Sequence, residues 1–450
     1  MPGVTSADSV TVRAARQLRG DLRLPGDKSI SHRALMLALL ADGESRIEAA
    51  GDGADVRSTA GICAALGASV ERAVDDETGN ASYRVVSPGA DGLRAADADL
   101  DCGNSGTSLR LFAGILAGLP FRSVLDGDDS LRRRPVARII EPLRSMGAAV
   151  HARSNDSLPP VTVIGRTPLR AVDVSTAVPS AQVKSAILLA ALRAEGRTTV
   201  RESVATRDHT ERMLRARGVA VVTDAGQQVD ERRGGVAISL EGGSTVLAVS
   251  ERVPGDVSAA AFWLVAGAIH PDAELTLRSV GVNPTRRAVL DILTAMGARI
   301  DEVALDGGGE PVADLTVRSS ELTGVDLGPR DVAAAIDEIP ILCLAATQAS
   351  GRTTIRGAGE LRHKESDRIA GIADGLRALG AQVEIDGDDI AIDGPIRLVG
   401  GATDSLEDHR LAMTFAIAGL IARGETLVGR PGSAAISYPT FFRDLEKVGA

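Results

Sequence analysis

The sequence predicts an α/β protein of two domains, each built from three repeats of strands and helices around buried helices. Its 450 residues, 44% of them hydrophobic, exceed what one hydrophobic core usually organises. One pattern also recurs six times at a spacing of roughly 70–80 residues, which is typical of repeat architectures. Two near-identical segments half a chain apart then divide the repeats into two sets of three.

Each repeat opens with an apolar helix of small residues that follows a polar segment and ends at a Gly turn and a β-like stretch. Because these helices are apolar all round, we expect them to be buried on every side. The six segments begin at Lys28, Gly103, Ser180, Gly255, Asp337 and Glu407.

A second, amphipathic helix follows in each repeat. Within residues 136–146, for example, apolar side chains recur at the spacing of one helical face. A glycine ends each of these helices, and we expect it to adopt the left-handed conformation of a C′ residue. These glycines are Gly67, Gly147, Gly218, Gly297, Gly380 and Gly449.

The domain boundaries follow from two near-duplicates, LPGDKS at residues 24–29 and VPGDVS at residues 253–258. Their Pro-Gly-Asp punctuation suits paired crossover strands between two domains of three repeats. We therefore expect a discontinuous domain of residues 1–26 plus 254–450, an inserted domain of residues 27–253, and a hinge near Pro25-Gly26 and Pro254-Gly255.

Composition excludes several classes of function. A net charge of −10 and an aromatic content of 2% argue against nucleic-acid binding. No run of about 18 apolar residues and no leader-like N-terminal segment occur, so we expect no membrane segment and a cytoplasmic location. Cys63, Cys102 and Cys343 lie far apart, which argues against a disulfide framework and a zinc site.

Basic residues lie where helix starts normally carry acids. The partial positive charge of a helix N-terminus disfavours Lys and Arg there by about 0.3–1 kcal/mol, yet we expect cations at the starts of the six buried helices. Several such cations would form converging anion sites for a ligand with phosphate and carboxylate groups. Pro135 is expected at the first position of a helix. The basic residues are Lys28, Arg33, Arg132, Arg133, Arg134, Arg207, Lys364, Arg368 and Arg410.

Polar and acidic residues accompany these cations. Asn104–Thr107 suits phosphate binding and N-capping equally well. Asp337, Glu338 and Glu365 are candidates for moving protons, although carboxylates beside cations are more often plain ion pairs. Residues 26–29 lack the glycine spacing of a phosphate loop, and no HExxH, GxSxG or strand-linked GxGxxG motif occurs.

Seven motifs together resemble the 3-phosphoshikimate 1-carboxyvinyltransferase (EPSP synthase) family over essentially the whole chain. The resemblance implies two domains of three βαβαββ units each, an inverse α/β barrel of the enolpyruvyl transferase type, closing over the substrates. The motifs are LPGDKSISHRA (24–34), DCGNSGTSLR (101–110), GDDSLRRRP (127–135), PSAQVKSA (179–186), TRDHTERML (206–214), LRHKESDR (361–368) and EDHRLAM (407–413).

The same resemblance implies substrates, site residues and the absence of any required metal or cofactor. Asp337, Glu365 and Lys28 are the implied catalytic residues, with the C3 proton left open between Lys28 and Glu365. The implied ligands of shikimate 3-phosphate are Lys28, Ser29, Arg33, Ser180, Ala181, Gln182, Arg207, Asp337 and Lys364. The implied ligands of phosphoenolpyruvate are Lys28, Asn104, Gly106, Arg134, Gln182, Arg368 and Arg410.

Two departures from the family pattern resemble its second sequence class. Ser130-Leu131 stands where many members have an Arg, so that role is assigned to Arg134, and Ile436-Ser437 stands where some have a Lys. Tolerant members of that class often have Ala at the position of Gly106, so we expect this chain to be inhibited by glyphosate. By family habit, a monomer is expected.

Two alternatives differ in substrate or in class. The enolpyruvyl transferase that acts on UDP-N-acetylglucosamine has Lys-Asn where this chain has Lys28-Ser29, and a Cys where the loop reads DDSLRRRP. The other alternative is a non-catalytic relative that binds phosphorylated ligands; the presence of Asp337, Glu365 and Lys28 argues against it.

Overall fold

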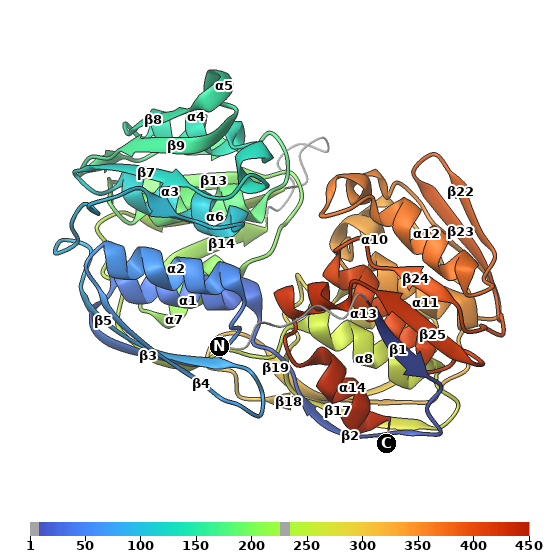
Figure 1. The fold of residues 1–450 in the computed structure, drawn as a ribbon. Coiled ribbons are helices and arrows are strands. Elements are labelled where there is room, and N and C mark those ends of the chain that lie inside the picture. The colour runs from blue at the N-terminus through green and yellow to red at the C-terminus, as the bar shows by residue number, and fades with distance from the viewer. Residues whose placement is uncertain (1–8, 226–234, 450) are drawn as a thin grey trace. The chain divides into compact units, whose positions relative to one another are not determined.

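The computed structural model describes residues 9–225 and 235–449. Their contacts divide the chain into two compact units, which are described separately (Figure 1). Unit 1 consists of Met1–Pro25, Pro254–Asp306 and Pro311–Ala450, and unit 2 consists of Gly26–Val253 and Gly307–Glu310. Unit 2 is therefore inserted into the sequence of unit 1.

Unit 2 contains three repeats, named here by their inner helices α1, α3 and α6. In each, one strand runs parallel to the first strand after the inner helix, and two antiparallel strands complete the sheet. The α1 repeat has α1 (Lys28–Leu40), β3 (Asp42–Ala50), α2 (Ala54–Ala65), β4 (Ser69–Val74), β5 (Ala81–Pro88) and the distant β16 (Ser250–Arg252). The α3 repeat has β6 (Leu100–Asp101), α3 (Gly106–Ala117), β7 (Arg122–Asp126), η1 (Leu131–Arg133), α4 (Ala137–Ser145), β8 (Ala149–Ala152), α5 (Arg153–Asp156) and β9 (Leu158–Ile164). The α6 repeat has β11 (Asp173–Ser175), α6 (Ala181–Ala191), β13 (Arg197–Glu202), α7 (His209–Ala216), β14 (Val221–Ala225) and β15 (Val236–Glu241), and the short β10 (Leu169–Arg170) and β12 (Ala194–Glu195) pair beside it.

Unit 1 repeats the scheme around α8, α11 and α13. The α8 repeat has β2 (Leu18–Arg23), α8 (Val257–Ile269), β17 (Ala273–Gly281), α9 (Ala288–Ala295), β18 (Arg299–Leu305) and β19 (Val312–Arg318). The α11 repeat has β20 (Asp326–Leu327), α10 (Pro329–Ala334), α11 (Ile339–Gln348), β21 (Gly351–Ile355), η2 (Gly359–His363), α12 (Arg368–Ala378), β22 (Val383–Asp386) and β23 (Asp389–Gly394). The α13 repeat has β24 (Ala402–Asp404), α13 (His409–Gly419), β25 (Glu425–Gly429), η3 (Pro431–Ile436), α14 (Phe441–Val448) and, from the start of the chain, β1 (Ser9–Arg13), which pairs antiparallel with β25.

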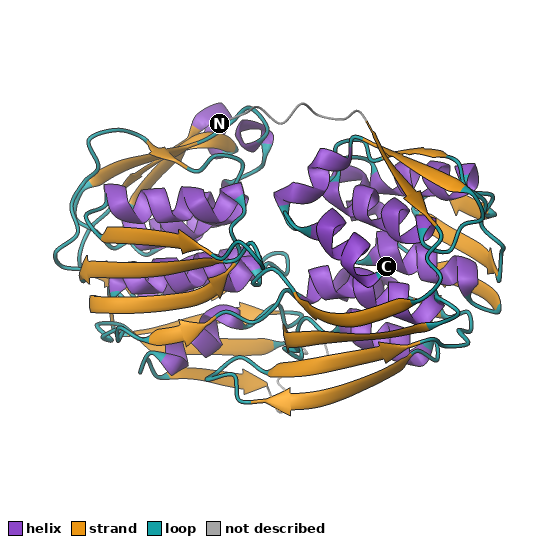
Figure 2. Ribbon diagram, turned by 60° about the horizontal axis from the view of Figure 1, so that its bottom comes forward, coloured by secondary structure: helices purple, strands orange, loops and turns teal. Residues whose placement is uncertain are grey.

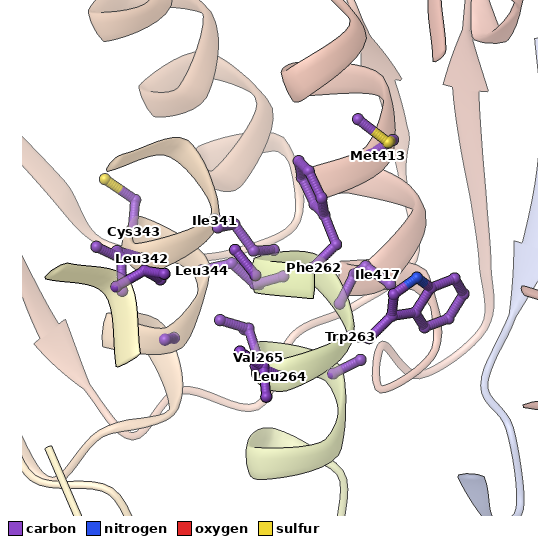
Figure 3. Packing of buried hydrophobic residues seen from close by; sticks show 14 of the residues in the cluster. Phe262, Trp263, Leu264, Val265, Ile341, Leu342, Cys343, Leu344, Met413 and Ile417 are labelled. Carbon is purple, nitrogen blue, oxygen red and sulfur yellow. The ribbon is translucent and has the colours of Figure 1, made fainter. Parts of the chain in front are cut away.

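The inner helices form the core of each unit, as predicted. Every residue of α8 from Val257 to Ala268 is buried, and so is every residue of α1 from Ile30 to Leu40. Apolar side chains of α8, α11 and α13 interlock around Phe262 and Ile417 (Figure 3). In each unit the helices lie against the inner faces of the sheets (Figure 2). The predicted fold class, a two-domain α/β protein made of six repeats, is confirmed.

At the carboxyl end of every inner helix, a backbone carbonyl oxygen accepts a hydrogen bond from another segment of the same repeat. After the last strand, a backbone N–H donates to a carbonyl oxygen at the end of the inner helix. These carbonyls would otherwise lack an intrahelical partner. The six donor–acceptor pairs are Ala90–Leu40, Arg166–Ala117, Gly243–Leu192, Ser320–Ala268, Ile396–Thr347 and, from the residues after β1, Ala15–Leu420.

The ends of the outer helices agree with the sequence at five repeats. Gly67, Gly147, Gly218, Gly297 and Gly380 all have positive φ, as expected of C′ residues. The prediction for Gly449 is wrong, because its φ is −94°. Gly449 is itself the C-cap residue of α14, whereas each of the other five glycines follows the C-cap residue of its helix.

The expected helix start at Pro135 is also wrong. Helix α4 begins at Ala137, and its N-cap residue is Val136. Arg132 and Arg133 belong instead to the short 3-10 helix η1. The carbonyl of Pro135 accepts a hydrogen bond from Arg110 (2.9 Å), which holds this residue in the loop before the helix.

Close packing of α3 on α6 depends on Gly114. A Cβ at this position would lie 2.2 Å from the carbonyl oxygen of Ala186. We predict that Gly114→Ala lowers the free energy of unfolding by about 1–3 kcal/mol, since the two helices would have to separate. Gly61→Ala on α2 is the control: a Cβ there meets nothing within 4 Å, so this change should stabilise the protein by about 0.5–1 kcal/mol. Equal midpoints for the two variants in denaturant titrations would contradict the prediction.

Candidate active site

The starts of the six inner helices differ from the expectation that each carries a cation. Among the six inner helices, α1, α6 and α13 carry a cation in the first turn, Lys28, Lys184 and Arg410. The expectation of cations at all six starts is therefore wrong for α3, α8 and α11. None of the six has an acid in its first turn. At α1, α8 and α13 an Asp occupies the N-cap position instead and accepts a backbone N–H, so the carboxylate sits just outside the helix.

In unit 2, Arg33 is the centre of a buried polar cluster. Its side chain, 4% exposed, donates to Thr210 Oγ1 (2.8 Å), to Ser185 Oγ (3.0 Å) and to the carbonyl oxygen of Ser29 (2.9 Å). Burial lowers the pKa of Arg33 to about 10, and the positive charge of Arg207 acts in the same direction. Two guanidinium groups so placed favour an anion between or beside them.

Lys28 is the first residue of α1, one helical turn before His32. Its ammonium group forms an ion pair with Asp55 of α2, and its side chain remains 43% exposed. Burial alone would raise the pKa of Asp55, but the charge of Lys28 outweighs this effect and the pKa is lowered. A half-exposed cation at a helix start is available to a ligand.

The starts of α3 and α6 meet through Gln182. Its Nε2 donates to Thr107 Oγ1 (3.0 Å), and its Oε1 accepts from Arg110 (2.8 Å). A Cβ at Gly106 would lie 2.6 Å from Nη1 of Arg110. Glycine at position 106 therefore leaves room for the Arg110 guanidinium.

The loop before α4 joins the same group. Arg134 donates to Asn104 Oδ1 (2.6 Å), and Asn104 Nδ2 donates to Asp128 Oδ2 (2.9 Å). Arg134, to which the loop role is assigned instead of Ser130, thus contacts Asn104.

Ser180 is the N-cap residue of α6, directly before Ala181, and Arg207 precedes Asp208, the N-cap of α7. In unit 2, Ser29, Arg33, Thr210 and Ser185 thus form one contact group, and Asn104, Arg134, Arg110 and Gln182 contact each other in pairs near Gly106.

A buried chain of hydroxyls connects the first three helices of unit 2. His32 Nδ1 lies 2.7 Å from Thr59 Oγ1, which lies 2.7 Å from Ser108 Oγ, and Ser108 Oγ donates to Ser105, the N-cap of α3. Burial lowers the pKa of His32 to about 3, aided by the charge of Lys28, so the ring is neutral at physiological pH. Sequence reasoning did not identify this chain: His32, Ser105 and Ser108 lie in the motifs, but Thr59 lies in none of them.

In unit 1, Arg368 forms ion pairs with three carboxylates. It is the first residue of α12 and 1% exposed, and it contacts Asp408 (2.7 Å), Glu365 (2.6 Å) and Asp337 (3.6 Å). Burial alone would raise the pKa of Glu365, but the charge of Arg368 outweighs it and the pKa is lowered. Glu365 is therefore ionised at neutral pH.

Lys364 extends this cluster towards Asp337. Its Nζ lies 3.8 Å from Asp337 Oδ1 and 2.7 Å from Glu360 Oε1. The four predicted residues Asp337, Lys364, Glu365 and Arg368 are thus brought together. Asp408, which the motif EDHRLAM contains but sequence reasoning did not select, completes the set.

A second buried pair lies beside this cluster on α11 and α13. Glu338, 2% exposed, faces Arg410 (3.5 Å) and accepts a hydrogen bond from Ser258, which also accepts one from Arg286 (2.7 Å). Burial lowers the pKa of His409, next to Arg410, to about 4. Glu338 therefore serves as a partner of Arg410, whereas Asp337 is 24% exposed and beside Lys364.

The described residues, 9–225 and 235–449, hold no group of three or more His, Cys, Asp or Glu side chains arranged for a metal ion. Nor does that part of the chain include a helix of the length and apolarity needed to cross a membrane. The geometry instead defines the class of protein: a two-unit α/β protein with cations and carboxylates gathered at helix starts.

The particular family follows from comparison with known proteins. The family model described as EPSP synthase (3-phosphoshikimate 1-carboxyvinyltransferase) matches residues 12–445. The enzyme of that name from Gloeobacter violaceus is 49% identical over 440 residues, 97% of this chain and 98% of the relative. The one from Geobacter metallireducens is 45% identical over 443 residues, 98% and 99% of the two chains. The solved EPSP synthase of Acinetobacter baumannii has a TM-score of 0.87 at 39% identity and 98% coverage of both chains. The chain belongs to the EPSP synthase family.

Proposed function

We propose that this protein transfers the enolpyruvyl group of phosphoenolpyruvate to the 5-hydroxyl of shikimate 3-phosphate, a step in aromatic amino acid biosynthesis. The observation that carries the proposal is the family match over residues 12–445, together with the contacts that join the motif residues within each unit. The UDP-N-acetylglucosamine reaction is the alternative to be tested.

The acceptor is assigned to the group around Arg33. Arg33, Ser29, Ser180, Ala181, Gln182 and Arg207 would hold shikimate 3-phosphate, with Lys28, Asp337 and Lys364 at its reacting hydroxyl. The buried guanidinium of Arg33 beside Arg207 supports a phosphate here, because charged N–H donors to a phosphate are short and strong.

Phosphoenolpyruvate is assigned to Arg368, Arg410, Arg134, Asn104, Gly106, Gln182 and Lys28. The 5-hydroxyl oxygen forms a bond to C2 while C3 gains a proton, which gives a tetrahedral intermediate. C3 then loses a proton and the C2–O bond to phosphate breaks. Asp337 would take the hydroxyl proton, the ammonium group of Lys28 would give C3 its proton in the first step, and the ionised Glu365 would take the C3 proton in the second step. The fixed guanidinium groups would stabilise the departing phosphate.

The deciding experiment measures phosphate release from phosphoenolpyruvate with two acceptors in parallel. We expect release with shikimate 3-phosphate and none with UDP-N-acetylglucosamine. Release only with the UDP-sugar would favour the alternative, and binding of shikimate 3-phosphate without release from either acceptor would favour a non-catalytic relative.

Glyphosate should inhibit the enzyme in competition with phosphoenolpyruvate. Position 106 is Gly, and an added Cβ would crowd Arg110 at 2.6 Å. We expect Gly106→Ala to raise the half-inhibitory glyphosate concentration by at least about tenfold, the size of a 1.4 kcal/mol loss, because the displaced guanidinium narrows the site. Steady-state inhibition curves for both proteins measure this. Full activity of the unmodified protein in millimolar glyphosate would contradict the prediction.

We further propose that the protein works as a monomer in the cytoplasm. Both statements follow from the resemblance to the family. Sedimentation of the purified protein, with and without substrates, measures its oligomeric state.

A further inference from the structure

We propose that Lys184, Glu202 and Glu211 are positioning residues that fix Arg207 for shikimate 3-phosphate, acting through Thr206. The inference rests on the proposed function, because it concerns the phosphate that Arg207 would hold. None of these three charged residues was selected by sequence reasoning, although Lys184 lies in the motif PSAQVKSA.

The three side chains form a closed ionic group within unit 2. Lys184 Nζ lies 2.9 Å from Glu202 Oε2 and 2.8 Å from Glu211 Oε1, and the side chains are 2%, 0% and 2% exposed. A charge buried this far is costly unless it is paired and hydrogen-bonded. The group has no access to solvent, so it does not itself bind a ligand. Any effect of the group on a ligand therefore passes through the residues that it contacts.

What it contacts is the residue before Arg207. Glu202 accepts hydrogen bonds from the backbone N–H of Thr206 (3.3 Å) and from its hydroxyl (2.6 Å), and Lys184 Nζ donates to the carbonyl of Thr206 (3.3 Å). All three polar groups of Thr206 are thus held by the buried ions. The backbone from which the Arg207 side chain departs cannot rotate without breaking them.

The neighbouring residues on the same two helices hold Arg33. Ser185 follows Lys184 on α6, Thr210 precedes Glu211 on α7, and their hydroxyls lie 2.6 Å apart while both accept from Arg33. One junction between α6 and α7 therefore sets the position of both guanidinium groups assigned to the phosphate. A shift of this junction would move them together.

The choice of Lys at position 184 is informative in this chain. Only four of its 50 cationic residues are lysines: Lys28, Lys184, Lys364 and Lys447. Two of the other three belong to the candidate active site. A compact ammonium group fits between two carboxylates and a carbonyl, whereas the planar fork of Arg does not have this geometry.

The test uses the full-length enzyme and four variants: Lys184→Met, Thr206→Val, Thr206→Ser and, as a matched control, Thr276→Val. The control removes a hydroxyl that lies 3.0 Å from Thr316 Oγ1 in unit 1. For each protein, KM for both substrates, kcat, and the Kd of shikimate 3-phosphate without phosphoenolpyruvate are measured, with the thermal midpoint as a fold control.

We expect Thr206→Val to raise the KM and Kd for shikimate 3-phosphate by about tenfold, the equivalent of one weakened charged contact, with KM for phosphoenolpyruvate within about twofold. Lys184→Met should have a larger effect in the same direction. Thr206→Ser, which keeps the hydroxyl, and Thr276→Val should match the unmodified protein.

Unchanged shikimate 3-phosphate affinity in Thr206→Val would overturn the inference, as would a parallel loss of affinity for both substrates. If Lys184→Met does not fold, the shikimate 3-phosphate affinity of Thr206→Val still tests the role of Thr206. Failure of the proposed function is seen separately, as an absence of turnover in the unmodified protein, and the Kd series tests the inference even then.

Discussion

Replacing Lys28 by Met is expected to lower kcat by about 10²–10³-fold or more, the loss typical of removing one charged donor from a transition state. The variant keeps the length of the side chain and the helix-forming tendency of the position, but it removes the charge at the start of α1. Since Lys28 is assigned to both substrates and to proton transfer, both KM values should rise as well. Steady-state phosphate release measures all three quantities.

Lys447→Met is the matched control for this prediction, because Lys447 is an exposed lysine of α14 in unit 1. It should leave kcat unchanged. Lys28→Met also leaves Asp55 without its ion-pair partner. The double variant Lys28→Met/Asp55→Asn separates this effect from the loss of the ammonium group. If the missing ammonium group lowers kcat, the second change does not restore turnover. A Lys28→Met protein that turns over at the unmodified rate would remove Lys28 from the site.

Arg368→Met is expected to combine a loss of turnover with a large loss of stability. The change leaves Asp337, Glu365 and Asp408 facing one another without the cation they share. Breaking a buried pair in this way typically costs about 3–5 kcal/mol. We expect the free energy of unfolding to fall by that amount, and kcat/KM for phosphoenolpyruvate to fall by about 10²–10³-fold.

The difference in unfolding free energy between the unmodified protein and Arg368→Met should become smaller as the pH falls. The pKa values of Glu365 and Asp408 are lowered in the folded protein, where Arg368 outweighs the opposing effect of burial. Lowered carboxyl pKa values stabilise the fold above about pH 4, the unfolded value, and this contribution is lost as the pH falls through the folded values. The gap between the unmodified protein and Arg368→Met should therefore narrow in acid.

Arg377→Met provides the control, since Arg377 lies on the same helix with its side chain 45% exposed. Its unfolding free energy should change by less than about 0.5 kcal/mol. Denaturant titrations from pH 7 down to about pH 2, through and below the unfolded carboxyl pKa values, compare the three proteins. A constant gap over this range would show that the ionised carboxylates do not account for the loss.

Much of this architecture was predictable because it depends on local sequence patterns, namely apolar helices and the glycines that end the outer helices. The inner helices are apolar throughout, and that property alone requires burial, as Val257–Ala268 shows. The outer helices end at glycines whose positive φ the sequence anticipated at five of six positions. The sequence also indicated Asp337, Lys364, Glu365 and Arg368, which the structure brings into contact.

The remainder depends on partners that are distant in the sequence. Arg110 contacts Gln182, 72 residues away, and Lys184 contacts two carboxylates on different elements. No spacing rule connects such positions. The N-cap role of Asp27 and Asp408 was not predicted: their side chains accept backbone N–H groups just before the first turn, which carries Lys28 and Arg410.

The pairing of β1 with β25 has a consequence for synthesis on the ribosome. Arg13 of β1 contacts Glu425 of β25 across 412 residues. At about 5–20 residues per second, the first strand waits roughly 20–80 s for its partner to be translated. Unit 2, which is contiguous apart from the short segment Gly307–Glu310, can fold during that time, whereas the α13 repeat closes only when nearly the whole chain has emerged. Until then β1 is a nascent strand without its partner β25, whereas β2 can pair with β17 as soon as Ala273–Gly281 has emerged.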